Sequence, residues 1–368
     1  MNDPDATTPE RDASAAPRPP GTDAAAPAVS VVVPVYNVER FVGDAIGSVL
    51  AQRFEDFELI VVDDRSPDAS MAVVAGFDDP RLRTVVHAEN RGLAGARNSG
   101  IRAARGRYVA LLDSDDRWDP DKLGAHVAHL DARPEVGVSF SRSLFIDERG
   151  RSLETYQMPR LSGIDADHLL CRNPVGNGSA PVLRREALDD IAFRANRHGT
   201  EETCWFDESF RQSEDIECWI RIAATTRWRF EGLSAPLTHY RLNPASLSAD
   251  IAKQLATWEA VMDKLRGYAP ELWARSGRLA RAFQLRYLAR QAVRQRDGAA
   301  ALRLALEALR TAPRMLAREP SRTLLTLGAA LALRLVPGSL YRRVEPLGAR
   351  LIGGTQRARI ALRREARA

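Results

Sequence analysis

Short apolar runs alternate with amphipathic stretches through the first third of the chain. Runs rich in apolar and β-branched residues, all of strand length, are "VSVVVPV", "FELIVV", "LRTVV" and "YVALL". Between the first two lies "VERFVGDAIGSVLAQ", in which Phe41, Ala45 and Val49 fall on one helical face. Strands that alternate with helices of about a dozen residues predict an α/β fold, a doubly wound and mostly parallel sheet with helices on both faces.

The pattern divides the chain into three regions. Residues 1–28 contain almost no large apolar residues and are predicted to be a disordered leader. Residues 29–250 carry the α/β pattern. From residue 251 the sequence is rich in Ala, Leu and Arg, and we expect an α-helical C-terminal extension. Its first helix should pack on a neighbour, because apolar residues recur there at helical spacing: Ile251, Leu255, Trp258, Met262 and Leu265.

The net charge of +5 conceals a strong asymmetry. Residues 1–250 carry 29 basic and 40 acidic residues, whereas residues 251–368 carry 24 basic and 8 acidic residues, a balance of +16. The front part should therefore recruit cations, and the basic tail should attract anions.

Three interpretations of the basic tail (251–368) remain open. An anionic membrane surface would contribute about 1 kcal/mol for each basic residue, and "RTLLTLGAALALRLV" combines apolar and cationic faces. A solvated helical bundle is nearly as good an account. Nucleic acid is not expected, because the tail has few aromatic residues. The longest charge-free apolar run, 323–333, has 11 residues, about half of the roughly 20 that a membrane-spanning helix needs.

The cysteines and the N-terminal residues bear on the compartment. Cys171, Cys204 and Cys218 are an odd number without CxxC spacing, which favours reduced thiols. The first residues lack the basic and apolar pattern of a signal peptide. We expect a cytoplasmic protein, peripheral on the inner face of the plasma membrane if the tail binds lipid.

Acidic residues follow the fourth predicted strand in "YVALLDSDDRW". Asp113, Asp115 and Asp116 come directly after the apolar run, and ligands of parallel sheets bind beyond the carboxyl ends of the strands. One aspartate would suffice to cap the following helix, so three exceed that need. Carboxylates without nearby Cys or His favour Mg²⁺ or Mn²⁺, whose other ligands come from water and substrate phosphates. We predict a metal–diphosphate site at these three residues.

Two other segments have a structural and a functional interpretation. Asp63 and Asp64 end the second predicted strand, where a carboxylate can accept hydrogen bonds from a base or ribose, whereas Asp68 or Ser66 nearby can simply cap the next helix. In "QSEDIECWIRIA", Glu214 and Asp215 begin a helix. Acidic residues there commonly complement the helix dipole, and a general base is the functional alternative. From this stretch alone the dipole account is preferred.

Five motifs together resemble the family 2 glycosyltransferases, which have the GT-A fold. They are "VSVVVPVYNVERFVGDAIGSVLAQ", "ELIVVDDRSPDAS", "ENRGLAGARNSGI", "GRYVALLDSDDRW" and "FDESFRQSEDIECWIRIA", and the resemblance covers roughly residues 29–245. It implies a nucleotide-sugar half (29–120) and an acceptor half (121–250). It also implies metal-dependent, inverting transfer of a sugar from a nucleotide-diphosphate donor, UDP-sugar in the simplest case. The expected acceptor is a hydroxyl of a glycan or a lipid-linked molecule in cell-envelope polysaccharide synthesis.

The resemblance also implies roles for individual residues. The nucleotide-sugar contacts that it implies are Pro34, Tyr36, Asp64, Arg97 and Asp113. Asp113 and Asp115 of the Asp-x-Asp motif would hold the metal, with Asp116 beside them, and Asp215 would be the base with Glu214 next to it. A loop that closes over the diphosphate or acceptor would involve His239, Arg241, Ser246 and Trp219.

Arg65 departs from the family pattern, which commonly has Gly after the Asp-Asp pair. If the turn there requires a positive φ, Arg65 is strained. Two other functions are alternatives. A sugar nucleotidyltransferase would need a Gly-rich, lysine-bearing loop after the first strand, and no lysine precedes Lys122. A non-catalytic sugar-binding scaffold would not need Asp115 and Asp215.

Overall fold

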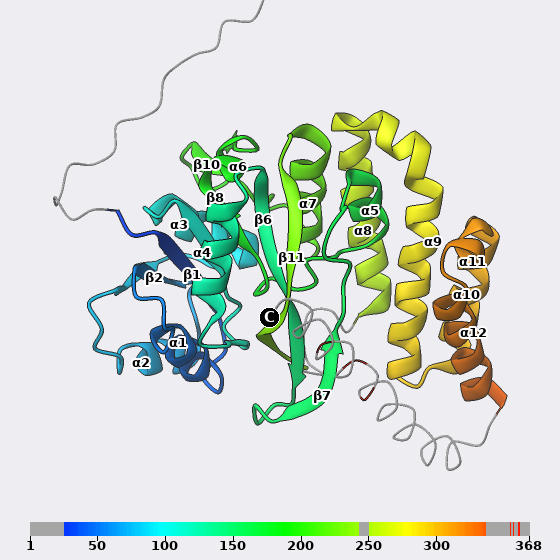
Figure 1. Cartoon of the computed structure of the whole chain (residues 1–368), viewed down its shortest axis with the longest axis horizontal. Coiled ribbons are helices and arrows are strands. Elements are labelled where there is room, and N and C mark those ends of the chain that lie inside the picture. The colour runs from blue at the N-terminus through cyan, green and yellow to red at the C-terminus, as the bar shows by residue number, and fades with distance from the viewer. Residues whose placement is uncertain (1–25, 243–249, 336–353, 355, 357–359, 361–368) are drawn as a thin grey trace, which may run out of the picture.

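A computed structural model of the chain describes residues 26–242 and 250–335, together with residues 354, 356 and 360. Most of the predicted leader, residues 1–25, lies outside the described residues. In the described part, one nine-stranded sheet has the order β3-β2-β1-β4-β8-β6-β11-β5, and β7 pairs with β6 (Figure 1). The strands of this sheet are β1 (Val29–Val35), β2 (Phe57–Asp63), β3 (Leu82–Val86), β4 (Tyr108–Leu111), β5 (Arg117–Trp118), β6 (Val136–Ile146), β7 (Ser152–Gln157), β8 (Val182–Arg184) and β11 (Arg229–Arg241). A separate hairpin joins β9 (Phe193–Ala195) and β10 (Glu202–Cys204).

The strand directions bring the functional segments to one edge of the sheet. β3, β2, β1 and β4 are parallel, and β11 is parallel to β6. β8 is antiparallel to both β4 and β6, so β4 and β6 run the same way. The carboxyl ends of β1, β2, β4 and β11 therefore lie at one edge. The predicted mostly parallel α/β sheet is confirmed.

Helices cover both faces of this sheet. In chain order they are α1 (Val42–Leu50), α2 (Ser70–Val74), α3 (Gly92–Ala103), α4 (Lys122–Ala132), α5 (Ala166–Cys171), α6 (Arg185–Asp189) and α7 (Glu214–Thr225). Side chains alternate along each strand, so neighbouring residues enter different cores. Val31 and Val33 pack in the core that includes α1 and α4, whereas Val32 packs in the core that includes α3 and α7. α2 is short and has five residues.

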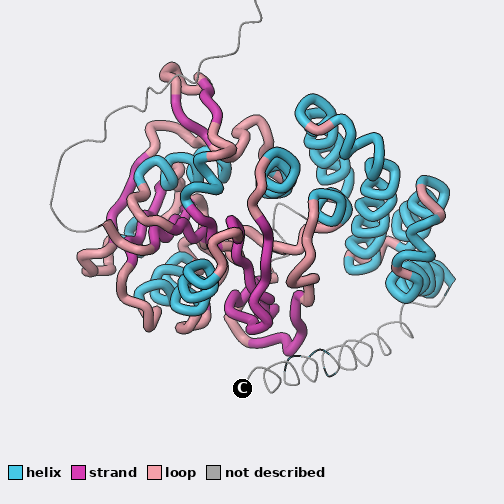
Figure 2. Tube along the Cα trace, turned by 45° about the horizontal axis from the view of Figure 1, so that its top comes forward, coloured by secondary structure: helices cyan, strands magenta, loops and turns pink. Residues whose placement is uncertain are grey.

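The C-terminal region forms a row of helices beside the sheet (Figures 1 and 2). Its helices are α8 (Ile251–Tyr268), α9 (Pro270–Arg294), α10 (Gly298–Thr311), α11 (Arg314–Arg318) and α12 (Pro320–Leu335). Trp258 and Met262 of α8 belong to the same buried cluster as Val32 of β1, which confirms that the first tail helix packs on a neighbour. The core therefore continues across the predicted boundary at residue 250. Within the described ranges, no helix is both long and apolar enough to cross a membrane.

Candidate active site

The acidic loop (residues 113–116) follows β4 and is anchored by its last residue. The Asp116 side chain is fully buried. Its Oδ2 accepts a hydrogen bond from Ser179 Oγ at 2.6 Å, and its Oδ1 accepts one from the backbone N–H of Arg241 at 2.8 Å. Ser179 Oγ in turn accepts a hydrogen bond from the backbone N–H of Asp113 at 3.0 Å. Both oxygens of Asp116 thus hold the loop in place, which leaves Asp113 and Asp115 as the carboxylates available to a metal.

Asp113 and Asp115 have the chemistry of a divalent-cation site. Asp115 is partly buried, and burial together with the charge of Asp113 raises its pKa to about 6. The repulsion between these two carboxylates would be relieved by a hard cation such as Mg²⁺ or Mn²⁺. Across the described part of the chain, no group of three or more His, Cys, Asp or Glu side chains is arranged to hold a metal. A Mg²⁺ ion commonly takes its other ligands from phosphate oxygens and water.

Arg97 of α3 links the acidic loop to α7. Its Nη2 lies 2.7 Å from Asp113 Oδ1, and its Nη1 lies 2.8 Å from Glu214 Oε1. Arg97 is 1% exposed, and its guanidinium also lies over the Phe206 ring, 5.5 Å from the centroid. The two carboxylates raise the pKa of Arg97 above its ordinary value despite burial. Arg97 was predicted as a nucleotide contact; the structure places it between two predicted functional carboxylates.

Glu214, a partner in this ion pair, and Asp215 are the first two residues of α7. Burial, opposed by the charge of Arg97 and assisted by the charge of Asp215, raises the pKa of Glu214 to about 7. The pKa of Asp215 is also raised, mainly by burial, and its Oδ1 accepts a hydrogen bond from the N–H of Ile216 at 2.7 Å. Ser213, just before the helix, has a left-handed φ of 61°. A carboxyl group whose pKa is raised toward neutrality is suited to accept a proton, as the base assignment requires.

The predicted nucleotide contacts lie at the ends of β1 and β2. Pro34 is buried in β1, and Tyr36 just after it is 49% exposed. Asp64 is 2% exposed, and its oxygens accept hydrogen bonds from the backbone N–H groups of Arg91 and Gly92 at 2.7 and 2.8 Å.

Asp64 Oδ1 also lies 2.8 Å from His87 Nδ1. Through its bonds with the Arg91 and Gly92 N–H groups, the Asp64 carboxylate holds the start of α3. Asp63 is more accessible than Asp64. Its Oδ1 accepts a hydrogen bond from the Ser66 N–H at 2.8 Å, and its Oδ2 has no hydrogen-bond partner among the described residues. Asp63 is therefore the member of the pair that is better placed to meet a nucleotide. The sequence signal for it was the Asp-Asp pair itself.

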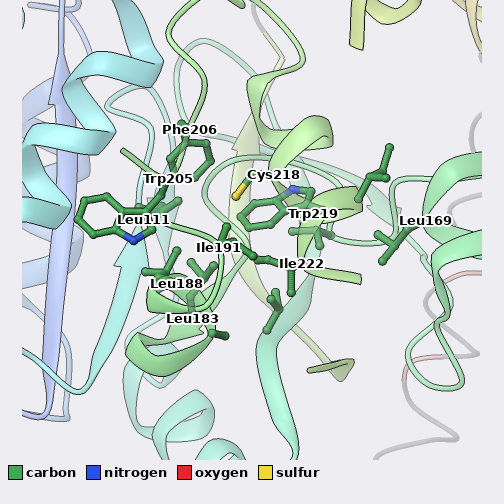
Figure 3. Packing of buried hydrophobic residues seen from close by; sticks show 14 of the residues in the cluster. Leu111, Leu169, Leu183, Leu188, Ile191, Trp205, Phe206, Cys218, Trp219 and Ile222 are labelled. Carbon is green, nitrogen blue, oxygen red and sulfur yellow. The ribbon is translucent and has the colours of Figure 1, made fainter. Parts of the chain in front are cut away.

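The residues of the predicted closing loop lie in different parts of the structure. Trp219 is 1% exposed in the core and meets Phe206 edge-on, 6.0 Å between ring centroids (Figure 3), so it is a packing residue and does not line the acceptor site. His239 pairs with Arg117 of β5 in the sheet, and burial lowers its pKa. Ser246 lies outside the described residues.

Arg241 is a clamp on the acidic loop. Its Nε donates to the carbonyl of Asp115 at 2.6 Å, and its Nη1 donates to the carbonyls of Asp147 and Glu148 at 3.0 and 2.8 Å. Its Nη2 lies 3.2 Å from Asp44 Oδ2 of α1. The guanidinium is buried and is bonded to these carbonyls and to Asp44. Arg241 therefore fixes the acidic loop and is not free to contact a diphosphate.

Sequence reasoning missed the segment 177–180. A Cβ at Gly178 would lie 2.1 Å from Arg97 Nη2 and 2.4 Å from Asp113 Oδ2, so only glycine lets the chain pass this ion pair. Ser179 joins Asp113 to Asp116 as described above. The available signal was "NGS" within the expected acceptor half, but its contacts are long-range and no local pattern encodes them.

The fold and the acidic loop define the chain as a glycosyltransferase of the GT-A type. It belongs to glycosyl transferase family 2, whose model matches residues 30–192. The UDP-Glc:alpha-D-GlcNAc-diphosphoundecaprenol beta-1,3-glucosyltransferase WfgD of Escherichia coli is 40% identical over 236 residues, which cover 64% of this chain and 85% of the relative. The succinoglycan biosynthesis protein ExoO of Rhizobium meliloti (strain 1021) is 37% identical over 207 residues, 54% of this chain. The match spans 56% of the length of that relative.

Solved structures support the same fold. TarS of S. aureus has a TM-score of 0.53 at 18% identity, over 83% of this chain and 53% of that one. The mannosyltransferase PcManGT from Pyrobaculum calidifontis, in complex with GDP-Man and Mn²⁺, has a TM-score of 0.51 at 21% identity, over 90% of this chain and 87% of that one. At these identities the likeness establishes the architecture, and the predicted GT-A fold is confirmed.

Proposed function

We propose that this protein transfers a sugar from a UDP-sugar to a hydroxyl group of a lipid-linked or glycan acceptor during cell-surface polysaccharide synthesis. The observation that carries the proposal is the placement of Asp113 and Asp115 at the carboxyl end of β4, joined through Arg97 to Glu214 at the start of α7. One end of this arrangement suits a metal-bound diphosphate, and the other suits a general base. The relatives named above support the substrate class, since one uses UDP-Glc and acts on a diphosphoundecaprenol-linked sugar.

The proposed reaction is a single displacement. Asp215 accepts the proton of the acceptor hydroxyl, and the hydroxyl oxygen forms a bond to the anomeric carbon. The bond from that carbon to the diphosphate oxygen breaks, and UDP leaves with the bonding electron pair. Because attack comes from the face opposite the diphosphate, the anomeric configuration inverts. A bound Mg²⁺ or Mn²⁺ would stabilise the negative charge on the departing diphosphate.

Residues of this chain prepare each part of the proposed site. Asp116, Ser179 and Arg241 hold the backbone of the acidic loop, so Asp113 and Asp115 are presented without reorganisation. Arg97 keeps Glu214 in place beside Asp215. We further propose that the basic tail (251–368) brings the enzyme to an anionic membrane surface, where a lipid-linked acceptor would be found.

Calorimetry of UDP binding tests the donor and metal assignments together. Wild-type protein should bind UDP strongly with Mn²⁺ and much more weakly with EDTA, and Asp115→Asn should lose most of the Mn²⁺-dependent gain. Asp121→Asn is the matched control, because Asp121 is exposed and pairs with Arg53. Equal UDP affinity with Mn²⁺ and EDTA would remove the metal from the proposal. Hydrolysis and transfer assays across UDP-sugars then identify the donor, and a complete lack of both would favour a non-catalytic scaffold.

A further inference from the structure

Five arginines gather where α5, α9 and α12 meet, and we call them the arginine cluster: Arg172, Arg286, Arg290, Arg294 and Arg322. Arg172 directly follows α5, and Arg322 lies in the first turn of α12. The other three are spaced four residues apart on α9, so they share one face of that helix. None of them is used by the proposed chemistry.

Among the described residues, Glu319 is the carboxylate that pairs with this cluster, and it reaches three of the five arginines. Arg172 and Arg286 both pair with Oε2 of Glu319, and Arg322 lies 3.7 Å from its Oε1. Within the described ranges, Arg290 and Arg294 form no ion pair. The Nε atoms of Arg172 and Arg286 are buried and have no hydrogen-bond partner among the described residues, although Arg286 is only 1% exposed. The cluster therefore has unused donors as well as unbalanced positive charge.

The repulsion within the cluster is visible at Arg290. Desolvation of its guanidinium and the positive charges of Arg172, Arg294 and Arg322 together lower the pKa of Arg290 to about 10, although its side chain is exposed. The group is still charged at neutral pH. Like charges held together in this way are relieved by an anionic ligand.

The cluster adjoins the acceptor side of the proposed site. The Arg290 guanidinium lies 6.0 Å from the ring centroid of Tyr287, on the same face of α9. Arg172 follows α5, whose Leu169 and Leu170 share a buried cluster with Trp219 of α7, the helix that begins with Glu214 and Asp215. Six residues after Arg172, a Cβ at Gly178 would meet the Asp113 carboxylate. The segment 172–178 therefore connects the cluster to the acidic loop.

Arginine suits phosphate because its planar guanidinium donates two parallel hydrogen bonds to one phosphate group. The proposed function assigns the donor's diphosphate to the acidic loop. The ligand of the cluster would therefore be a second phosphorylated molecule. We propose that the arginine cluster binds the diphosphate of a polyprenyl-diphosphate-linked acceptor and so presents the acceptor sugar to Asp215. This inference rests on the proposed function and adds to it the place where the acceptor's phosphates are held.

Farnesyl diphosphate, a short prenyl diphosphate, is a suitable probe for calorimetry on the full chain. Mn²⁺ and saturating UDP keep it from the donor site, because UDP then occupies that site. The variant is Arg290→Gln/Arg294→Gln, which leaves the pairs with Glu319 intact. The matched control is Arg303→Gln/Arg310→Gln, two exposed arginines of α10 without an ion pair among the described residues. We expect the variant to weaken farnesyl diphosphate binding by about tenfold or more, and the control to change it less than about twofold.

Three results would overturn the inference. The first is that the wild type does not bind farnesyl diphosphate, and the second is that the variant binds it as tightly as the control does. The third is that the variant loses binding to phosphatidylglycerol vesicles while farnesyl diphosphate binding is unchanged, which would assign the cluster to the membrane surface. UDP binding with Mn²⁺ separates this inference from the proposed function. If one of these three results is obtained while every protein still binds UDP, only the acceptor site is overturned. If the wild type does not bind UDP, the result counts against the proposed function itself.

Discussion

The guanidinium of Arg97 lies 2.8 Å from the carboxylate of Glu214, although 117 residues separate them in the chain. Its other nitrogen lies 2.7 Å from Asp113, so one buried side chain connects α3, the acidic loop and α7. Removing one partner of a buried ion pair leaves an uncompensated charge, which is far more costly than losing an exposed pair. This relationship makes the metal end and the base end of the site mechanically dependent on each other.

The first prediction tests this dependence with a double-mutant cycle. Arg97→Gln should lower the free energy of unfolding by about 3 kcal/mol, because it leaves Glu214 and Asp113 without their counter-charge. Glu214→Gln alone should cost little, because the pKa of Glu214 is already raised toward neutrality. The loss from Arg97→Gln should be smaller when residue 214 is Gln. Urea denaturation measures all four proteins. The control cycle uses the exposed pair of Arg53 and Asp121, 2.6 Å apart, whose coupling should stay below about 1 kcal/mol. Additive losses at Arg97 and Glu214 would contradict the bridging role.

The second prediction concerns the base. Asp215→Asn keeps the size of the side chain but cannot take the acceptor proton, so the rate of sugar transfer should fall by about 10²–10⁴. UDP affinity should stay within about threefold of wild type, because the predicted nucleotide contacts lie on other elements. Glu214→Gln should lower the rate less, because Glu214 acts through position. Transfer by Asp215→Asn at nearly the wild-type rate would return these two residues to a helix-dipole role.

The third prediction is a pH dependence of stability. The pKa of Glu214 is raised from 4.5 to about 7 in the folded protein, so the folded state holds this proton more tightly than the unfolded state does. The contribution of Glu214 to stability is therefore lost as the pH rises from about 4.5 to 7 and changes no further above that. Relative to Glu214→Gln, the wild type should lose up to about 3 kcal/mol over this range. Parallel stability curves of the two proteins between pH 4.5 and 8 would show that Glu214 does not titrate in this way.

The fourth prediction concerns Arg65, which follows the Asp63-Asp64 pair. It is exposed and has a left-handed φ of 64°, which costs a residue with a Cβ about 1–2 kcal/mol. Arg65→Gly removes this strain but adds freedom to the unfolded chain, so a net gain of about 0.5 kcal/mol is expected. Arg149→Gly is the control, because Arg149 is exposed in a turn and does not have a positive φ. The Arg149→Gly protein should be less stable than the wild type. A loss of stability in both variants would mean that Arg65 makes a compensating contribution.

The fifth prediction concerns the basic tail. The full chain should bind phosphatidylglycerol vesicles, and binding should fall steeply with salt because exposed charges are screened. Leu325 of α12 is 71% exposed, so Leu325→Gln should weaken vesicle binding, whereas Leu153→Gln on β7, where Leu153 is 41% exposed, should not. Deleting the tail is a poor test, because Trp258 and Met262 of α8 complete the core of the sheet. Failure of the wild type to bind at low salt would favour a solvated helical bundle.

Periodic patterns in the sequence determined the elements of this fold. The apolar runs of β1, β2 and β4 and the spacing of Ala45 and Val49 in α1 are local signals, since strand and helix periodicity depend on nearby residues alone. The rule that parallel strands end at one edge then placed Asp63 and the acidic loop together. The resemblance of five motifs to a family supplied the chemistry that no single motif carried.

Only the tertiary structure decided which of these residues are free to act. Asp64 and Asp116 look like Asp63 and Asp115 in the sequence, yet their oxygens are taken up by the start of α3, by Ser179 and by the backbone of Arg241. These partners lie 27 to 125 residues away, and no local pattern records them. The same holds for Arg97 between Asp113 and Glu214, and for Glu319 among the arginines of α9 and α12. The reason is physical: whether a charged side chain binds a ligand depends on which groups the fold brings within hydrogen-bonding distance of it, and burial then decides what its charge costs.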